Sequence, residues 1–249
     1  MRLQFFLVLS GILMLTCMAY KPVIIIHGVW DLRFSLNFLA EQIRQYHIGT
    51  EVHIIDILHG WRSLAPLWYQ VKKFHEQMLP VMQKASDGVI LIDDFLRLIF
   101  PQYIKETVYE VFYSRIGQRV SVANYWNDPH HQALYYKYSD YLPYLNNEIN
   151  DSYSKEYRQN FLKLKKLVLI GGPDDGVITP WQSSHFGYFD SEENITEMRD
   201  QIFYQQDLFG LHTLDKGGRI KIYEVPGVYH TNWHHNMSVI KNCILPWLD

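Results

Sequence analysis

The sequence is poor in cysteine, with only Cys17 and Cys243 among its 249 residues. Small secreted folds that are held together by disulfides need several cysteine pairs. Cys17 lies in an apolar N-terminal run that we expect to be removed, which leaves Cys243 without a partner in the mature chain. A disulfide framework is therefore excluded. The fold must rest on a hydrophobic core, for which the 48% hydrophobic content is sufficient.

The chain also lacks an excess of charge of either sign. Its 23 lysines and arginines nearly balance its 26 aspartates and glutamates, for a formal net charge of -3. This balance gives no electrostatic reason to expect binding to nucleic acid. The sequence contains no internal repeat, low-complexity run or linker, and we therefore expect a single domain after the N-terminal segment.

The first residues have the pattern of a secretory signal peptide. Arg2 supplies a positive start, an apolar run extends over residues 3–15, and small residues end at Ala19. The run is too short to span a bilayer, so we expect a signal peptide at 1–19 that is cleaved before Tyr20. The mature chain, 20–249, should then enter the secretory pathway without a stable membrane span.

Three glycosylation sequons agree with that route. They begin at Asn150, Asn194 and Asn236, each followed two residues later by serine or threonine. Each is a possible acceptor only if the chain enters the secretory pathway.

Apolar runs typical of buried strands alternate with segments of helical spacing. The expected strands cover 23–26, 52–58, 89–92, 166–170 and 220–225, and the expected helices cover 35–46, 64–78, 195–204 and 239–247. Pro80 should kink or end the second of these helices. This alternation predicts an α/β fold, a mostly parallel sheet with helices on both faces.

The alternation breaks after residue 93. The stretch 95–163 is aromatic and polar with no clear strand, which predicts a helical insertion above the sheet. Its aromatic residues fit either a half-buried amphipathic surface or a wall that binds lipid.

Three groups that could carry chemistry follow predicted strands. His27-Gly28-Val29 follows the first strand, Asp174-Asp175 the fourth and His230 the fifth. Ligands of parallel sheets bind at the carboxyl ends of the strands, and aspartate followed by histidine is the order of an α/β-hydrolase triad. Each motif taken alone is also typical of an ordinary turn.

Longer motifs resemble one family. The stretch 171–190, GGPDDGVITPWQSSHFGYFD, is similar to the aspartate region of the palmitoyl-protein thioesterases, and to their second, lysosomal paralogue most of all. The segments 21–28, 66–68, 124–131 and 227–234 resemble the same family, so the resemblance covers nearly the whole mature chain.

The resemblance implies an α/β-hydrolase fold whose helical insertion binds a long acyl chain. It implies cleavage of fatty-acyl thioesters, either S-acylated proteins or acyl-CoA, in the lysosome. Carried over by position, Asp175 is the triad acid, His230 the triad base and the Val29 N–H an oxyanion donor. No metal or organic cofactor is implied.

One essential part of that pattern is missing. The segment 88–92 resembles the strand that leads into the nucleophile elbow, but Asp93 and Asp94 follow it, and no Gly-x-Ser-x-Gly occurs anywhere in the chain. A segment of roughly 30–40 residues, one helix and one core strand with the serine, is absent by comparison with the family. Loss of an interior strand should expose two sheet edges, unless the sheet closes across the gap.

Other residues are weaker candidates for the missing nucleophile or for a different site. Asp93 or Asp94 could attack in place of serine, but neither has the small neighbours that a sharp turn needs. Cys243 lies on the last helix, and capping or turn roles are expected for Ser183 and Ser184. Adjacent histidines occur at 130–131 and 234–235, but no carboxylate or cysteine cluster accompanies them as metal ligands.

Three hypotheses follow from the sequence. The first is a fatty-acyl thioester hydrolase whose chain here lacks the nucleophile segment, as a truncated isoform or gene model would. The second is an inactive secreted protein that binds an acyl lipid in the inherited groove. The third is a structural or carbohydrate-binding glycoprotein, which the triad-region resemblance disfavours.

Overall fold

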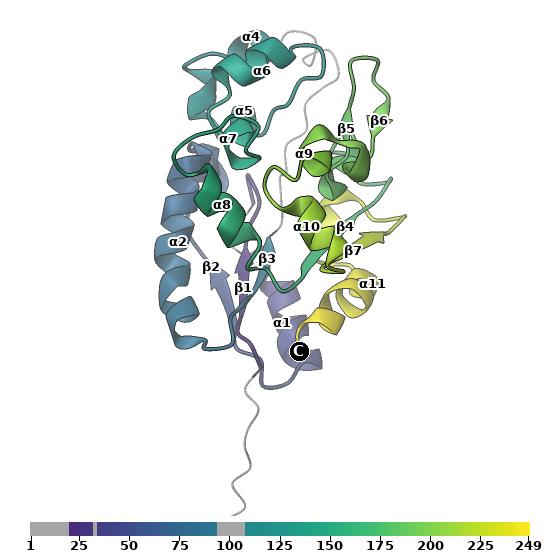
Figure 1. Ribbon diagram of the computed structural model, residues 1–249. Coiled ribbons are helices and arrows are strands. Elements are labelled where there is room, and N and C mark those ends of the chain that lie inside the picture. Colours follow the sequence, from purple (N-terminus) through teal and green to yellow (C-terminus); the bar gives the residue numbers. More distant parts are fainter. Residues whose placement is uncertain (1–19, 32–33, 94–107) are drawn as a thin grey trace, which may run out of the picture.

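The computed structural model describes residues 20–31, 34–93 and 108–249, in an α/β arrangement (Figure 1). The predicted signal peptide, 1–19, lies outside these residues. Strands β1 (Val23–Ile26), β2 (Val52–Ile55) and β3 (Ile90–Asp93) form a parallel sheet in the order β2-β1-β3. In this register Ile26 pairs with Ile55 on one side and with Asp93 on the other. The three predicted N-terminal strands are thereby confirmed.

Strand β1 alternates between two cores because successive side chains of a strand point to opposite faces. Val23 and Ile25 pack with helix α1 (Asn37–Tyr46), whereas Ile24 and Ile26 pack with helix α2 (Leu67–Lys84). The two helices therefore cover opposite faces of the first sheet, as the alternating pattern predicts.

Pro80 lies inside α2, which continues to Lys84, so the proline does not end this helix. Pro80 is on the exposed side of the helix. The backbone carbonyl that a proline leaves without a donor can be hydrated by solvent there, which reduces the cost of the lost hydrogen bond.

A second parallel sheet consists of β4 (Leu167–Gly171) and β7 (Ile220–Glu224). Strands β5 (Tyr188–Phe189) and β6 (Ile195–Thr196) form an antiparallel hairpin between them in sequence. The helix predicted over 195–204 is wrong. That stretch contains β6, the 3₁₀ helix η4 (Met198–Asp200) and the short helix α9 (Ile202–Gln205), because pairing with Phe189 and the extended Gln201 interrupt it.

The two parallel sheets run in the same direction but do not join. Rings of Phe38 and His235 lie 5.4 Å apart near the carboxyl ends of β1 and β7. At the amino ends, Lys165 donates to the Asp87 carbonyl at 3.5 Å. Within the described residues β3 and β4 are not hydrogen-bonded to each other, and Leu91 of β3 is 52% exposed. The sheet has thus not closed across the predicted gap.

The C-terminal segment connects the two sheets. Helix α11 (Met237–Val239) continues into a π-helical turn (Ile240–Ile244) and a 3₁₀ turn (Leu245–Trp247). Ile240 and Leu248 pack into the core of the first sheet, while Val239 and Cys243 pack against the second. Ile244 contacts both clusters. The predicted last helix is confirmed, and it spans the break between the sheets.

The described part of the region between β3 and β4, 108–165, consists of short helices joined by turns and contains no strand, and most of it lies above the carboxyl ends of the strands (Figure 1). The predicted start of the insertion at 95 falls outside the described residues. The elements are α4 (Val108–Phe112), η2 (Gly117–Arg119), α5 (Ser121–Asn124), α6 (Gln132–Tyr138), α7 (Leu142–Leu145) and α8 (Ser154–Phe161). The remaining helices are η1 (Gly60–Leu64), η3 (Trp181–His185), α10 (Leu211–Lys216) and η5 (His230–Asn232).

Aromatic contacts fix the insertion to α2. The indole of Trp68 donates to the Asp140 carbonyl at 2.7 Å. Its ring lies 4.7 Å from that of Tyr141 and 5.7 Å from that of Tyr157. The aromatic residues that stand out in the sequence thus form packing contacts between α2 and the helices above it.

A carboxyl group lies where the insertion meets the β5–β6 hairpin. The buried Tyr135 donates its hydroxyl to Glu148 at 2.7 Å, and Tyr136 and Tyr188 also lie within range of this carboxyl. Burial raises the pKa of Glu148, and the hydrogen bond from Tyr135 offsets this only in part. Folding therefore favours the protonated form of Glu148.

We expect Ile240→Ala to lower the free energy of unfolding by about 2–5 kcal/mol, because Ile240 of the C-terminal segment is fully buried in the core of the first sheet. Urea denaturation monitored by circular dichroism measures the loss. Ile48→Ala is the control, since Ile48 is 81% exposed. An equal loss in both variants would contradict a bridging role for the C-terminal segment.

We expect Glu148→Gln to stabilise the protein progressively, relative to the wild type, as the pH rises from about 4 toward 7. A carboxyl whose pKa is raised by folding contributes stability below its unfolded pKa and loses it as pH rises through the folded pKa. Thermal unfolding across this range compares the two proteins, with Glu41→Gln as an exposed control. A pH-independent difference between wild type and Glu148→Gln contradicts the prediction.

Candidate active site

Two glycines at the end of β4 allow the Asp175 turn to form. A Cβ on Gly172 would lie 2.1 Å from the Val225 carbonyl oxygen, and one on Gly171 would lie 2.0 Å from the Ser184 hydroxyl. Only glycine permits these approaches, which bring the end of β4 against η3 and against Val225, the residue that follows β7. Asp175 is consequently buried beside the loop that carries His230.

Asp175 and His230 are joined by hydrogen bonds of both side chain and backbone. The Nδ1 of His230 lies 2.9 Å from Oδ2 and 3.1 Å from Oδ1 of Asp175. The His230 backbone N–H donates to the Asp175 carbonyl at 2.9 Å. Both side chains are less than a tenth exposed. With Nδ1–H donating to the carboxylate, Nε2 carries the lone pair that a general base requires.

Further donors converge on the same carboxylate. Trp233 Nε1 donates to Oδ2 at 2.7 Å, and the N–H of Ile178 donates to Oδ1 at 2.8 Å. Burial alone would raise the pKa of Asp175, but the hydrogen bonds from His230, Ile178 and Trp233 outweigh it and lower that pKa. The carboxylate therefore stays ionised and can stabilise a positive charge on the imidazole ring.

Asp174 has a different role. Its carboxylate accepts the backbone N–H of Gly227 at 2.7 Å, and the residue is exposed. Asp174 thus fixes the turn after β7, while Asp175 faces His230. The family resemblance and the geometry select the same member of this aspartate pair.

The loop after β1 has a strained backbone held by side chains from other segments. Trp30 has a φ of 64°, and its N–H donates to the Ser63 hydroxyl at 2.7 Å. The His27 ring lies between the Ile57 and Gly28 carbonyls, at 2.6 and 2.9 Å. Among the described residues the neighbouring Val29 N–H has no acceptor. An unpaired N–H in a held loop is the arrangement that an oxyanion donor needs.

Asp93 occupies the end of β3, where the resemblance places the start of the nucleophile elbow. It is the last strand residue, paired with Ile26, and it is exposed. Its charge contributes to raising the pKa values of Tyr125 and Tyr141 in the insertion, both of which are raised first by burial. Asp93 therefore lies within a strand beneath the insertion. Asp94 falls outside the described residues.

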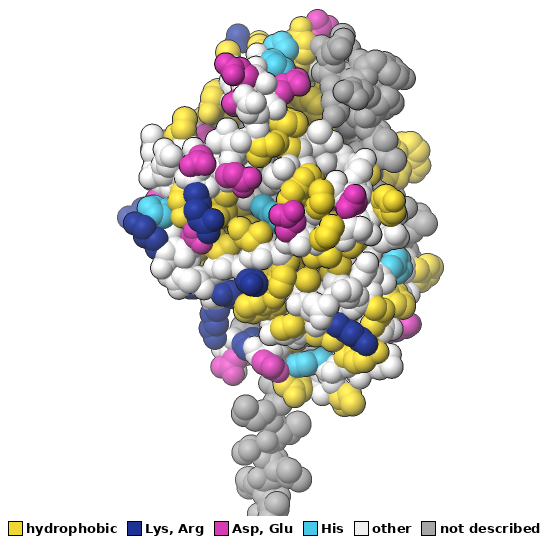
Figure 2. Space-filling model, turned by 90° about the vertical axis from the view of Figure 1, so that its right-hand side faces the viewer, with side chains coloured by type: hydrophobic (Ala, Val, Ile, Leu, Met, Phe, Trp, Pro, Cys, Tyr) yellow, Lys and Arg dark blue, Asp and Glu magenta, His cyan; other side chains and the backbone are white. Residues whose placement is uncertain are grey.

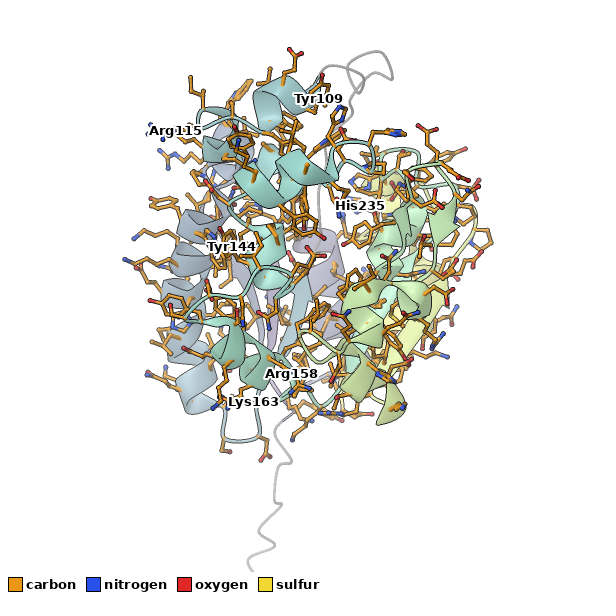
Figure 3. The ribbon with its side chains drawn as sticks, turned by 45° about the horizontal axis from the view of Figure 1, so that its top comes forward. Tyr109, Arg115, Tyr144, Arg158, Lys163 and His235 are labelled. Carbon is orange, nitrogen blue, oxygen red and sulfur yellow. The ribbon has the colours of Figure 1, made fainter. Side chains whose placement is uncertain are left out.

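The other residues considered as a nucleophile or as metal ligands lie in separate parts of the fold. Cys243 is buried in the C-terminal segment, where burial raises the pKa of its thiol. Ser184 donates to the Trp181 carbonyl within η3, in agreement with a turn role. His131 pairs with Asp128, whereas the ring of His235, labelled in Figure 3, lies 5.4 Å from that of Phe38. No group of three potential metal ligands occurs in the described part of the chain.

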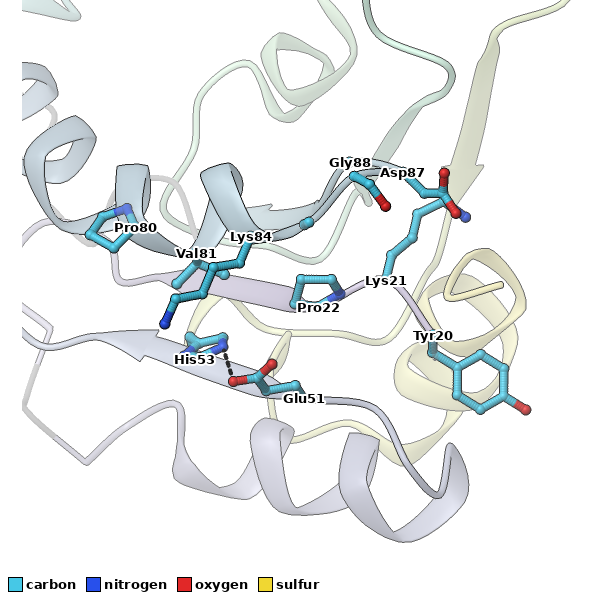
Figure 4. A pocket seen from close by; sticks show the side chains of 12 residues that line it. Tyr20, Lys21, Pro22, Glu51, His53, Pro80, Val81, Lys84, Asp87 and Gly88 are labelled. Carbon is cyan, nitrogen blue, oxygen red and sulfur yellow. Dashed lines mark ion pairs between the residues drawn. The ribbon is translucent and has the colours of Figure 1, made fainter. Parts of the chain in front are cut away.

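A shallow cavity of about 270 Å³ lies at the opposite end of the first sheet, near the amino ends of its strands (Figure 4). Residues around it include Tyr20, Glu51, His53 and Lys84. Its position separates it from Asp175 and His230. None of the helices in the described ranges is both long and apolar enough to cross a bilayer.

Sequence reasoning did not identify Trp233, Ser63 or the structural role of His27. Trp233 lies three residues after His230, a spacing that places two side chains on one side of a helical turn, and this could have indicated a shared partner. The contact of Ser63 with Trp30 joins residues 33 positions apart, and no local pattern indicates it.

Comparison with known proteins gives one consistent result. The family model "Palmitoyl protein thioesterase" matches residues 92–230. The mouse protein named "Lysosomal thioesterase PPT2" is 40% identical over 268 residues, covering 93% of this chain and 89% of the relative. The Drosophila melanogaster protein "Lysosomal thioesterase PPT2 homolog" is 37% identical over 278 residues, covering 95% of this chain and 96% of the relative.

The mouse alignment also measures what this chain lacks. It extends over 268 positions, whereas 93% of 249 residues is about 232, so about 36 aligned positions have no residue here. Identity at this level, sustained over nearly the whole of both proteins, shows common descent as well as a common fold. The chain therefore belongs to the palmitoyl protein thioesterase family.

Proposed function

We propose that this protein carries the fold and the acid–base pair of a lysosomal hydrolase of fatty-acyl thioesters, with S-acylated proteins or acyl-CoA as substrates. The observation that carries the proposal is the buried hydrogen-bonded pair of Asp175 and His230 at the carboxyl ends of β4 and β7. The names of the relatives, lysosomal and palmitoyl-protein thioesterases, support the substrate class and the compartment.

In this proposal each group has a defined role. His230 accepts a proton from an attacking hydroxyl, and the ionised Asp175 stabilises the resulting imidazolium. The Val29 N–H stabilises the oxyanion that forms on the thioester carbonyl. His230 then donates its proton to the leaving thiolate, and water releases the acyl group from the nucleophile by the same steps.

The attacking hydroxyl has no source in this chain. The sequence contains no Gly-x-Ser-x-Gly, and the strand that should lead into the serine ends in Asp93. We therefore propose that this chain does not turn over substrate, and that hydrolysis belongs to a form of the protein that contains the missing segment.

A binding role without turnover is the alternative. The helical insertion also carries aromatic side chains that remain exposed, among them Tyr136 and Tyr138 of α6. Such side chains provide apolar area for an acyl chain. In that case palmitate analogues should protect the fold against thermal unfolding although no thioester is cleaved.

We expect no labelling of this chain by a fluorophosphonate probe, because the probe needs an activated serine. Grafting the corresponding segment of the mouse relative between Ile92 and Asp93 should restore both labelling and hydrolysis of palmitoyl-CoA. Gel fluorescence and thiol release measure the two. Labelling of the ungrafted chain would refute its proposed inactivity.

In the grafted protein, Asp175→Asn should lower kcat by roughly 10⁴-fold, as loss of the triad acid does elsewhere. Asp174→Asn is the matched control, since the neighbouring carboxylate binds only the Gly227 N–H in the described structure. It should retain activity within about tenfold. Equal losses in both variants would mean that the turn, and not the acid–base pair, limits hydrolysis.

We also propose that the protein enters the secretory pathway through cleavage of 1–19 and carries N-linked glycans. Asn150 and Asn194 are exposed, whereas the side chain of Asn236 caps α11. In secreting cells, Asn150→Gln and Asn194→Gln should each reduce the apparent mass by one glycan on a gel. Variants that migrate with the wild type, together with a wild-type band that glycosidase does not shift, would contradict this route.

A further inference from the structure

Element η1 and the first described helix of the insertion, α4, expose large apolar side chains. Trp61 in η1 is 75% exposed, and Val111 on α4 and Ile116 after it are 60% and 81% exposed. Exposure of single apolar residues is ordinary, but three that gather at one corner of a fold indicate a contact surface.

Elements η1 and α4 pack against one small hydrophobic core, which holds them side by side. Leu64 of η1 packs against the cluster that contains Phe112 of α4 and Val122 of α5. The Ser121 hydroxyl donates to the Ser63 carbonyl at 2.8 Å, which ties η1 to α5 directly. The exposed ring of Trp61 rests on Trp30, at 4.7 Å between centroids. The surface is therefore fixed by the fold.

Three arginines lie in or shortly after the same elements, η1 and α4, and in the neighbouring η2. Arg62 follows Trp61, Arg115 precedes Ile116, and Arg119 ends η2; Arg115 extends outward beside the insertion in Figure 3. None of the three forms an ion pair with the described part of the chain. These three arginines outnumber Glu110, the one carboxylate in 60–64 and 108–119, in a chain of net charge -3.

Exposed tryptophan and aliphatic side chains interspersed with arginine match the chemistry of an anionic bilayer surface. The apolar groups can enter the boundary between headgroups and acyl chains, and the arginines can bind lipid phosphates. The side of the molecule seen in Figure 2 differs, because charged side chains of both signs are interspersed there with hydrophobic ones.

We propose that Trp61, Arg62, Val111, Arg115, Ile116 and Arg119 form a docking surface for an anionic lipid bilayer. Element η1 follows the carboxyl end of β2, so the docking surface lies at the same end of the fold as the candidate site. Docking would place that end toward the membrane. The proposal concerns binding alone and holds whether or not the chain hydrolyses a thioester.

The test is co-sedimentation of the purified mature chain with phosphatidylcholine vesicles that do or do not contain phosphatidylserine. Binding should require phosphatidylserine and weaken with added salt. The double variant Trp61→Ser/Ile116→Ser and the triple variant Arg62→Glu/Arg115→Glu/Arg119→Glu should each weaken the apparent Kd by at least about tenfold.

Matched control variants distinguish binding through this surface from nonspecific adsorption of the protein to vesicles. Ile48→Ser changes a side chain that is as exposed as Ile116 but lies before β2, at the other end of the sheet. Lys216→Glu reverses an exposed charge on α10. Both should bind as the wild type does, and unfolding temperatures confirm that all variants fold.

Three outcomes overturn the proposal. The wild type does not sediment with phosphatidylserine vesicles, or the control variants lose as much affinity as the surface variants, or the surface variants bind unchanged. Self-association that disappears in Trp61→Ser/Ile116→Ser, without vesicle binding, would instead assign the surface to a second copy of the chain.

Discussion

Packing of the C-terminal segment across a break in the sheet is the contact on which this structure depends. Within the described residues, β3 and β4 present facing edges without a ladder between them. Ile240 and Leu248 belong to one core, Val239 and Cys243 to the other, and Ile244 to both. Burial of apolar area by one continuous helical segment replaces the backbone hydrogen bonds that an intact sheet would supply.

The same contact determines how the candidate site is assembled. The Val29 N–H belongs to the first sheet, whereas Asp175 and His230 follow strands of the second. The acid–base pair is internally well fixed, because the Asp175 carboxylate accepts hydrogen bonds from three donors, the N–H of Ile178 in its own turn and the side chains of His230 and Trp233. Its alignment with the oxyanion loop depends on the C-terminal segment that packs against both sheets, together with the contact of Phe38 with His235. Catalysis requires both halves to be held within a fraction of an ångström.

Two parts of the candidate site are held by contacts within the described residues. The turn after β4 keeps the approach that only glycine allows, and the loop after β1 keeps its left-handed Trp30 and the Ser63 bond. These features depend on neighbours that the missing segment does not contribute. The hydrogen-bonded pair of Asp175 and His230 therefore forms in a chain that contains no Gly-x-Ser-x-Gly.

The sequence by itself predicted the strands of both sheets and most of the helices, and its resemblance to one family singled out Asp175 and His230, which the structure joins by a hydrogen bond. The strands and helices follow from local periodicity, and the two residues from the motifs at 171–190 and 227–234. The tertiary structure decided the features that depend on contacts between residues far apart in the sequence. It replaced the predicted helix at 195–204 with a hairpin strand and two short helices, let α2 continue past Pro80, and brought Trp233 and Ser63 to the site. It also left the sheet open between β3 and β4, because a strand edge pairs only when another strand lies beside it, and no local pattern specifies that neighbour.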